Sequence, residues 1–192
     1  MGGSGASPGR RPQRNRDPEA RRAALAAAAI EVIAELGIAR TTHRAVAARA
    51  GLPLGATTYY FPTLDDLVAA GLALATEALR AELRSWAGRL DAAEDLPDAL
   101  IGLVEEYLTD RQRVRLEYDL YLAAARDPAL RPLAEAWLHG FRDLLEPKLG
   151  AEAARAVVAL LDGAMLQALV TGADLDGPAL TAAIRRLATP RS

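Results

Sequence analysis

The sequence predicts an all-α protein, and three observations support this. Apolar residues recur at three- and four-residue spacing along most of the chain, which is the period of an amphipathic helix. Proline, glycine and aspartate stand between these stretches, where helices are expected to end and begin. No segment combines sustained two-residue alternation with β-branched residues, so strands are not expected. We expect three helices in the N-terminal third and a bundle of about six helices after them.

The expected elements begin with a basic arm. Residues 1–17 are rich in glycine, serine, proline and arginine and have no apolar side chains that could anchor them, so disorder is expected. Asp17 is a suitable N-cap and Pro18 a suitable first residue for the first helix. Its apolar stripe is Leu25, Ala29, Val32, Ile33 and Leu36. Gly37 is the expected C-cap.

Two short helices and one long helix are expected next. The short ones cover about 42–50, closed by Gly51, and about 53–60, before Pro62 breaks the chain. Thr63 and Asp66 have capping-box spacing, which predicts the start of a long helix extending to Trp86. The remaining expected helices are 97–109, 112–126, 129–146, 152–171 and 178–188.

The composition excludes several classes of protein. Of the 192 residues, 51% are hydrophobic and 25% are charged, the balance of a soluble globular protein with a sizeable core. The absence of cysteine excludes disulfide scaffolds, cysteine nucleophiles and thiolate metal sites. The two histidines, His43 and His139, are too few for a histidine-rich metal cluster. We expect neither a metal site nor a cofactor.

The apolar stretches predict no membrane span. The longest, residues 23–34 and 156–170, are shorter than the ~18–20 residues needed to cross a bilayer, and both contain acidic side chains. The alanine-rich run after the N-terminal arginines resembles a signal peptide, but Glu31 interrupts it and Asp17 and Glu19 precede it. We expect a cytoplasmic protein.

The net charge of −2 hides an uneven distribution. Residues 1–63 hold nine arginines and four carboxylates, a net charge of +5, whereas residues 64–192 have a net charge of −7. A basic N-terminal third on an acidic body indicates that the front of the molecule meets a polyanion.

Residues 41–67, TTHRAVAARAGLPLGATTYYFPTLDDL, carry the most specific pattern. Two short helices separated by a glycine-containing turn make a helix-turn-helix, with Val46, Ala47 and Leu52 facing inward. The second helix presents small, hydroxylated and aromatic residues suited to the major groove of DNA. These are Leu54, Thr57, Thr58, Tyr59 and Tyr60.

Residues 23–67 resemble the DNA-binding region of the TetR family of bacterial transcriptional regulators. The segments that carry the resemblance are AALAAAAIEVIAELGIARTT, HRAVAARAG and PLGATTYYF followed by PTLDDL. The resemblance implies a homeodomain-like helix-turn-helix domain at 18–62 and a ligand-binding and dimerisation domain at 63–192. Family members usually have tyrosine where this chain has Thr58, and lysine where it has Leu64.

The resemblance also implies a homodimer that binds a palindromic operator. Thr42, Arg44 and Tyr59 would contact phosphates, with Arg40 as a further electrostatic candidate. Thr63 and the helix start behind it would bind the phosphate that the missing lysine usually holds. The residues near base edges would be Leu54, Gly55, Ala56, Thr57 and Thr58. The arginine arm either adds DNA contacts or is a solubilising tail.

The family pattern implies a small-molecule effector that shifts the dimer away from its DNA-binding state. For a pocket we selected aromatic, soft and polar residues on the central helices, although each alone could equally pack in the core. They are Trp86, Tyr107, Glu117, Tyr118, Tyr121, Trp137, Phe141, Met165 and Gln167. His139 is expected at the surface or in the core.

A helix at 152–171 is apolar around most of its circumference and must be covered on two sides. With the final helix it is the expected dimer interface, a four-helix arrangement about a two-fold axis; a central core helix in a monomer is the alternative. The interface candidates are Val157, Leu160, Leu161, Ala164, Ala168, Ile184 and Leu187.

Other functions remain as alternatives. An enzyme is disfavoured because neither histidine lies in a nucleophilic arrangement and no glycine loop could cradle phosphate. A helical adaptor that binds only protein would have no DNA affinity and no need for the basic N-terminal third. Within the regulator interpretation a repressor is the default, and an activator is the alternative.

Overall fold

The computed structural model describes residues 17–189 and is all-α, as predicted. Among these residues there is no strand. The helices are α1 (Pro18–Leu36), α2 (His43–Ala50), α3 (Leu54–Tyr60), α4 (Leu64–Asp91), α5 (Leu96–Tyr107), α6 (Arg111–Ala123), α7 (Arg131–Leu149), α8 (Ala151–Thr171) and α9 (Gly177–Ala188). Two 3-10 turns, η1 (Ile38–Arg40) and η2 (Pro128–Leu130), connect them. The arginines of the predicted N-terminal arm lie outside the described residues.

The predicted caps define the helix ends. The Asp17 carboxylate accepts the Glu19 N–H at 2.9 Å and begins α1. Thr63 and Asp66 form the predicted capping box at the start of α4, each side chain bonding to the other residue's backbone N–H. Gly37 and Gly51 end α1 and α2 with φ of 80° and 64°, which side chains rarely tolerate.

Three boundaries differ from the prediction by three residues or more. α4 continues past Trp86 to Asp91. α6 ends at Ala123, three residues earlier than expected, because the next backbone bonds are i to i+3, as in Arg126 N–H to Ala123 O. α7 continues through Pro147 to Leu149 and is capped at Gly150, whose N–H donates to the Glu146 carbonyl at 2.9 Å.

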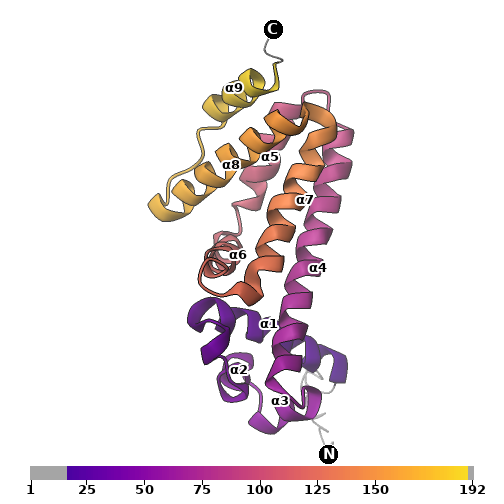
Figure 1. The fold of residues 1–192 in the computed structure, drawn as a ribbon, viewed down its shortest axis with the longest axis vertical. Helices are drawn as coiled ribbons and strands as arrows, with labels where there is room; N and C mark the ends of the chain where they lie inside the picture. Colours follow the sequence, from indigo (N-terminus) through magenta and orange to yellow (C-terminus); the bar gives the residue numbers. More distant parts are fainter. Residues whose placement is uncertain (1–16, 190–192) are drawn as a thin grey trace, which may run out of the picture.

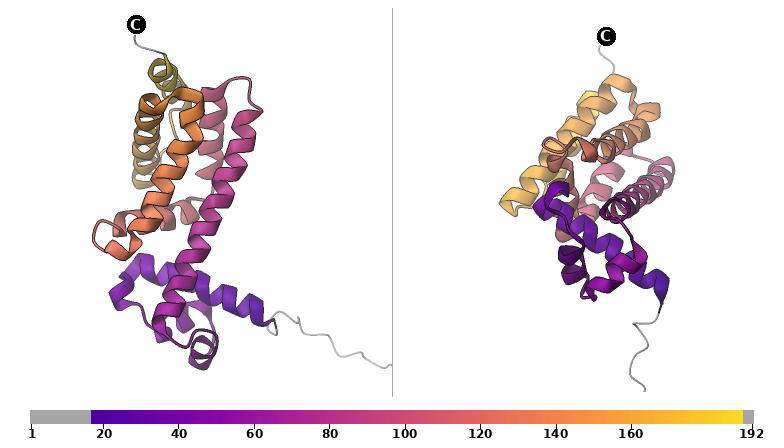
Figure 2. Two further views of the ribbon diagram at one scale, coloured as in Figure 1. Left: turned by 45° about the vertical axis from the view of Figure 1, so that its right-hand side comes forward. Right: turned by 60° about the horizontal axis from the view of Figure 1, so that its bottom comes forward.

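The long helix α4 runs along the molecule and joins its two parts (Figure 1). Helices α1–α3 lie at one end of α4, and α5 and α7 pack against its other end. Helix α8 packs on α7, and α9 packs on α5 and α8 (Figure 1). Helix α6 lies between the two parts, next to α1 and α7, and a second view shows the same arrangement (Figure 2). A change in α6 or α4 therefore has a direct path to the N-terminal helices.

Three apolar clusters hold the parts together. One fills the N-terminal three-helix group and includes Leu25, Val46 and Phe61. The largest fills the C-terminal bundle around Trp86 and Phe141. The third joins α1 to α4, α6 and the η2 turn through residues such as Ile30, Ile33, Val68, Leu120 and Leu130. The two parts are thus joined by a packed apolar contact as well as by the α4 backbone.

α8 is long and apolar enough to cross a membrane by length and composition alone. The same pattern is expected of a core helix in a bundle. Val157, Leu161 and Met165 on this helix are fully buried in the bundle core, and Asp162 lies beside them on the same helix. This packing accounts for the apolar character of one side of α8.

Candidate ligand cavity and nucleic-acid interface

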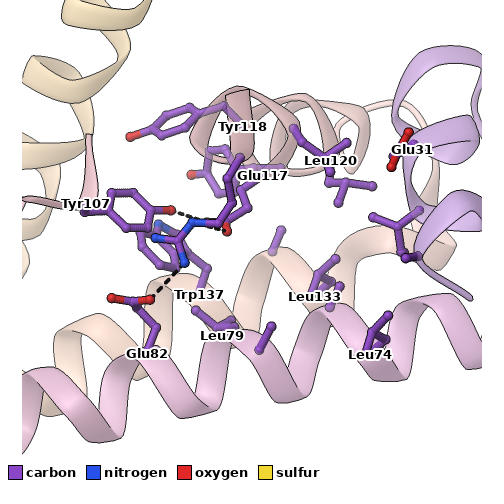
Figure 3. Close-up of a pocket in the computed structure, with 18 residues that line it drawn as sticks. Glu31, Leu74, Leu79, Glu82, Tyr107, Glu117, Tyr118, Leu120, Leu133 and Trp137 are labelled. Carbon is purple, nitrogen blue, oxygen red and sulfur yellow. Dashed lines mark hydrogen bonds and ion pairs between the residues drawn. The ribbon is translucent and has the colours of Figure 1, made fainter. Parts of the chain in front are cut away.

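A cavity of about 270 Å³ lies between α1, α4, α6 and α7. Its walls are mainly apolar, with Leu74 and Leu79 from α4, Leu120 from α6 and Leu133 from α7 (Figure 3). Glu31 of α1 lies at one end, and a polar and aromatic group lies at the other. A mostly apolar cavity with a few convergent polar groups is the usual form of a small-molecule site.

The polar end is a connected network of side chains. The Tyr107 hydroxyl donates to the Glu117 carboxylate. The Arg113 guanidinium donates to Glu82 Oε2 at 3.0 Å, and its Nε lies 3.8 Å from Glu117 Oε1. The Trp86 indole N–H donates to the other oxygen of Glu82 at 2.8 Å. Helices α4, α5 and α6 thereby fix both carboxylates.

Aromatic rings enclose this polar network. Tyr107 and Trp137 stack with centroids 5.9 Å apart and planes inclined by 21°. Tyr118 and Tyr121 meet edge to face on the α6 side, with centroids 6.3 Å apart. The Arg113 guanidinium carbon lies 4.9 Å from the centroid of the Tyr107 ring. This end of the cavity therefore already binds one cation by an aromatic face and two carboxylates.

Burial shifts the titration of the acidic groups here. Burial raises the pKa of Glu117 above its usual value near 4.5, although the Tyr107 hydroxyl and Arg113 partly oppose that shift. Burial also raises the pKa of Asp162. The Trp137 indole N–H, 3.5 Å from Asp162 Oδ1, partly offsets that rise. The pKa of Tyr107 is raised as well, chiefly by burial and then by the Glu117 charge, so its hydroxyl stays a donor.

The predicted ligand residues separate into two groups. Those that line the cavity are Tyr107, Glu117, Tyr118, Tyr121 and Trp137. Trp86, Phe141 and Met165 do not line it, because they are 2% exposed or less and pack in the bundle core. Gln167 is exposed on α8 and also lies outside the lining. The corrected set is therefore limited to the first group.

Arg113, Glu82 and Glu31 also line the cavity and were not predicted from the sequence. Two of them had a detectable signal, because Arg113 and Glu82 each lie one helical turn before a selected residue, Glu117 and Trp86. Glu31 had none, since nothing local shows that α1 of the N-terminal domain reaches a cavity in the bundle.

The helix-turn-helix forms where it was expected. The Thr42 side chain caps α2 by accepting the Ala45 N–H at 3.1 Å, and Gly51 makes the turn to α3. Val46 and Phe61 are buried beneath the two helices. Tyr59 is 79% exposed at the end of α3 and is the most protruding aromatic side chain of this domain.

Most predicted DNA-binding residues lie at the surface of this domain. The exposed ones are Arg40, Thr42, Arg44, Leu54, Gly55, Thr58, Tyr59 and Thr63, and Ala56 and Tyr60 are partly exposed. Thr57 is the exception: its side chain is fully buried and its hydroxyl donates to the Leu54 carbonyl at 2.7 Å. A base contact through the Thr57 side chain is therefore incompatible with this packing, and the expectation for it is corrected.

Two of the exposed side chains already have partners. The Thr63 hydroxyl donates to Asp66 Oδ2 at 2.7 Å and accepts the Asp66 N–H, so the capping box uses both of its functions. Arg40 Nε donates to the Leu36 carbonyl at 2.9 Å, which leaves its terminal nitrogens for other contacts. Of the two, Arg40 is the better placed to meet a phosphate.

Comparison with known families decides the relationship. The family model described as "Bacterial regulatory proteins, tetR family" matches residues 25–70, and "Tetracyclin repressor-like, C-terminal domain" matches residues 91–190. The chain belongs to the TetR family. It is therefore a DNA-binding transcriptional regulator with a helix-turn-helix, the interpretation that its sequence favoured over a protein-only adaptor. Its TetR-family relatives are regulators and not enzymes.

Curated TetR-family relatives cover most of the chain. The regulator BetI of Burkholderia thailandensis is 31% identical over 171 residues, covering 82% of this chain and 86% of that protein. BetI of Stenotrophomonas maltophilia is 29% identical over 164 residues, covering 79% and 83%. The regulator CymR of Pseudomonas putida is 33% identical over 125 residues, covering 65% and 61%.

Solved TetR-family structures are also similar. The multidrug binding protein EbrR complexed with imidazole is 44% identical with a TM-score of 0.71, covering 90% of this chain and 97% of that chain. SCO1917 of Streptomyces coelicolor A3 is 44% identical with a TM-score of 0.73, covering 89% and 99%. Other EbrR structures contain proflavin, malachite green or ethidium.

TetR regulators dimerise, and the predicted interface residues of this chain divide by burial. Val157, Leu161 and Ile184 are fully buried and Ala168 is 4% exposed, because they fill the chain's own core. These four cannot offer side-chain surface to a partner. Leu160, Ala164 and Leu187 are partly exposed. Leu166 and Val170 on α8, which the sequence analysis did not select, are 36% and 78% exposed.

Proposed function

We propose that this regulator is a repressor that binds a palindromic operator as a homodimer and releases it when an aromatic cation enters the cavity. In this account α3 enters the major groove, with Leu54, Gly55, Ala56 and Thr58 near base edges. Thr42, Arg44 and Tyr59 contact phosphates. The protein acts in the cytoplasm, and residues 63–192 form the effector and dimerisation domain.

The chemistry of the cavity is the observation that carries the effector class. Its lining holds three carboxylates, Glu31, Glu82 and Glu117, and one cationic side chain, Arg113. All the other residues that line the cavity are aromatic or aliphatic. Negative charge held against aromatic faces favours an organic cation over an anion or a sugar.

The similar solved structures support the same class. EbrR, at 43–44% identity, has been solved with proflavin, malachite green and ethidium, which are all aromatic cations. EbrR is described as a multidrug binding protein. We extend to this chain the class of ligand and not any one compound.

The apolar junction supplies a path from the cavity to the DNA-binding helices. Leu120 both lines the cavity and packs in the cluster that joins α6 to α1. Ile30 of α1 does the same. A ligand that moves α6 against α1 would shift the helix-turn-helix, and operator binding would in turn weaken ligand binding by the same factor.

The test is to titrate the purified protein with proflavin, a cation, and with acridine, the same tricyclic ring without charge at mildly alkaline pH. Quenching of tryptophan fluorescence reports binding, since Trp137 lines the cavity. We expect proflavin to bind at least about tenfold more tightly. Glu82→Gln combined with Glu117→Gln should remove that preference. Equal binding of the two rings by the wild-type protein would overturn the proposed effector class.

A further inference from the structure

Arg113 already occupies the polar end of the cavity. Its guanidinium lies over the Tyr107 ring at 4.9 Å, donates to Glu82 at 3.0 Å and approaches Glu117 at 3.8 Å. An aromatic face and two carboxylates are the contacts that a bound organic cation would make. The protein's own side chain therefore stands where the effector's positive charge is expected.

The cavity offers no second place of this kind. The third lining carboxylate, Glu31, lies at the opposite end, near the N-terminal helices (Figure 3). The residues that α1 contributes to the lining, Ala27, Ile30 and Glu31, include no aromatic ring. A cation that seeks both a ring and paired carboxylates must therefore compete with Arg113.

Arg113 can leave without unfolding the helix that carries it. It is the third residue of α6, and its backbone N–H is held by the Asp110 carboxylate at 3.0 Å. Its side chain is 42% exposed, so rotation about side-chain bonds takes the guanidinium into solvent. The positive end of the α6 dipole also disfavours a cation in this first turn, so the carboxylates and the ring hold it in place.

We propose that Arg113 is an internal occupant of the cation subsite, displaced by the effector, and that the subsite prefers planar cations that donate N–H hydrogen bonds. Aryl amidines and aminoacridines have this chemistry. A guanidinium is flat and presents its N–H groups at its edge, and a group that replaces it between the same carboxylates needs that shape. The inference rests on the proposed cationic effector and adds its head-group chemistry and a specificity-determining residue.

The experiment is calorimetric titration of full-length wild type and Arg113→Ala with p-phenylbenzamidine, a cation, and with p-phenylbenzamide, its neutral isostere. An occupant present about nine-tenths of the time lowers apparent affinity about tenfold, so Arg113→Ala should bind the amidine about tenfold more tightly. Binding of the amide should not change. Arg113→Gln, which removes the charge and keeps N–H donors on a shorter side chain, repeats the test if the alanine variant unfolds.

Arg115→Ala is the matched control. Arg115 is exposed on the same helix and does not line the cavity, so its removal changes net charge equally and should leave amidine affinity unchanged. Phenyltrimethylammonium, a cation without N–H groups, should bind Arg113→Ala more weakly than the amidine does.

The outcomes separate the two proposals. If wild type binds the amidine and Arg113→Ala binds it equally or more weakly, Arg113 is no competitor, and the cationic effector class still stands. If phenyltrimethylammonium equals the amidine in Arg113→Ala, the head-group preference is wrong. If neither protein binds any cation, the proposed effector class fails and the inference fails with it.

Discussion

Glu31 of α1 lines the ligand cavity and also accepts a hydrogen bond from Arg49 of α2 at 3.1 Å. Arg49 pairs with Glu35, a second α1 carboxylate, as well. The side chains of Glu31 and Arg49 are 46% and 37% exposed, so solvent screens the pair. One residue thus faces the cavity and contacts the helix-turn-helix.

We expect Glu31→Gln to cost less than about 1 kcal/mol of unfolding free energy, because exposed ion pairs contribute little. It should nevertheless change the factor by which a bound cation weakens operator binding. Urea denaturation measures the first quantity, and anisotropy of labelled operator with and without ligand measures the second. Glu77→Gln, which removes the exposed pair with Arg84 on α4, is the control. An unchanged factor would show that Glu31 does not take part in coupling.

Tyr59→Ala should weaken operator binding strongly while leaving the thermal unfolding midpoint unchanged. The side chain is 79% exposed, so its removal leaves no cavity in the core. Tyr59→Phe should lose most of the same affinity if the hydroxyl donates to a phosphate. Fluorescence anisotropy at two salt concentrations measures both variants. If Tyr59→Ala bound the operator with wild-type affinity, α3 would not be part of the DNA interface.

Gly71→Val should destabilise the junction between α1 and α4. A Cβ atom at Gly71 would lie 3.1 Å from the Ala26 carbonyl oxygen and 3.3 Å from the side chains of Ala29 and Ile30. Overpacking of this kind costs about 1–3 kcal/mol. Gly88→Ala, on the exposed end of the same helix, meets nothing within 4 Å and should stabilise by about 0.5–1 kcal/mol. Thermal unfolding of the two variants tests whether the close approach of α1 and α4 is the reason that position 71 requires glycine.

Glu117→Gln should become increasingly stabilising, relative to wild type, as pH rises. Burial raises the folded-state pKa of Glu117 above 4.5, so the folded protein favours the neutral carboxyl. The stability that this preference contributes is fully present in acid and is lost as pH rises through the folded-state pKa, where the buried carboxyl ionises. Denaturation of both proteins across the mildly acidic range measures the difference. Glu106→Gln should show the opposite trend, because Arg89 lowers the pKa of that carboxyl. A difference independent of pH would contradict the burial argument.

Leu166→Glu combined with Val170→Glu should produce folded monomers. Both side chains are exposed on α8 and neither fills the core, so the changes should act on a dimer interface and spare the fold. Sedimentation velocity gives the oligomeric state, and anisotropy gives the accompanying loss of operator affinity. Retention of a dimer would place the interface on another face.

Local patterns were sufficient for much of the fold. Thr63 and Asp66 could be assigned as a capping box from their spacing, and Gly37 and Gly51 as C-caps from their positions, because these features depend on neighbouring residues. The helix-turn-helix was predicted for the same reason. The buried Thr57 was missed because a seven-residue helix shows too little periodicity to separate its inner and outer faces.

Long-range packing decided the rest. Trp86 and Trp137 are both aromatic residues on central helices, yet the first is buried in the core and the second lines the cavity. Whether a ring faces the core or the cavity depends on how α4 and α7 are oriented about their axes relative to α5 and α6. A local sequence pattern does not determine that orientation. For the same reason Val157 and Leu161 could not be distinguished in sequence from the exposed Leu166 and Val170 on the same helix.

The measurement closest to the central claim is operator binding in the presence of a cation. Anisotropy of duplexes tiled across the DNA flanking the gene identifies the operator, and p-phenylbenzamidine is then added at constant ionic strength. We expect the amidine to weaken operator binding by wild type, p-phenylbenzamide to leave it unchanged, and Glu82→Gln with Glu117→Gln to abolish the effect. Operator affinity that is unchanged by saturating amidine would contradict the claim that this cavity controls DNA binding.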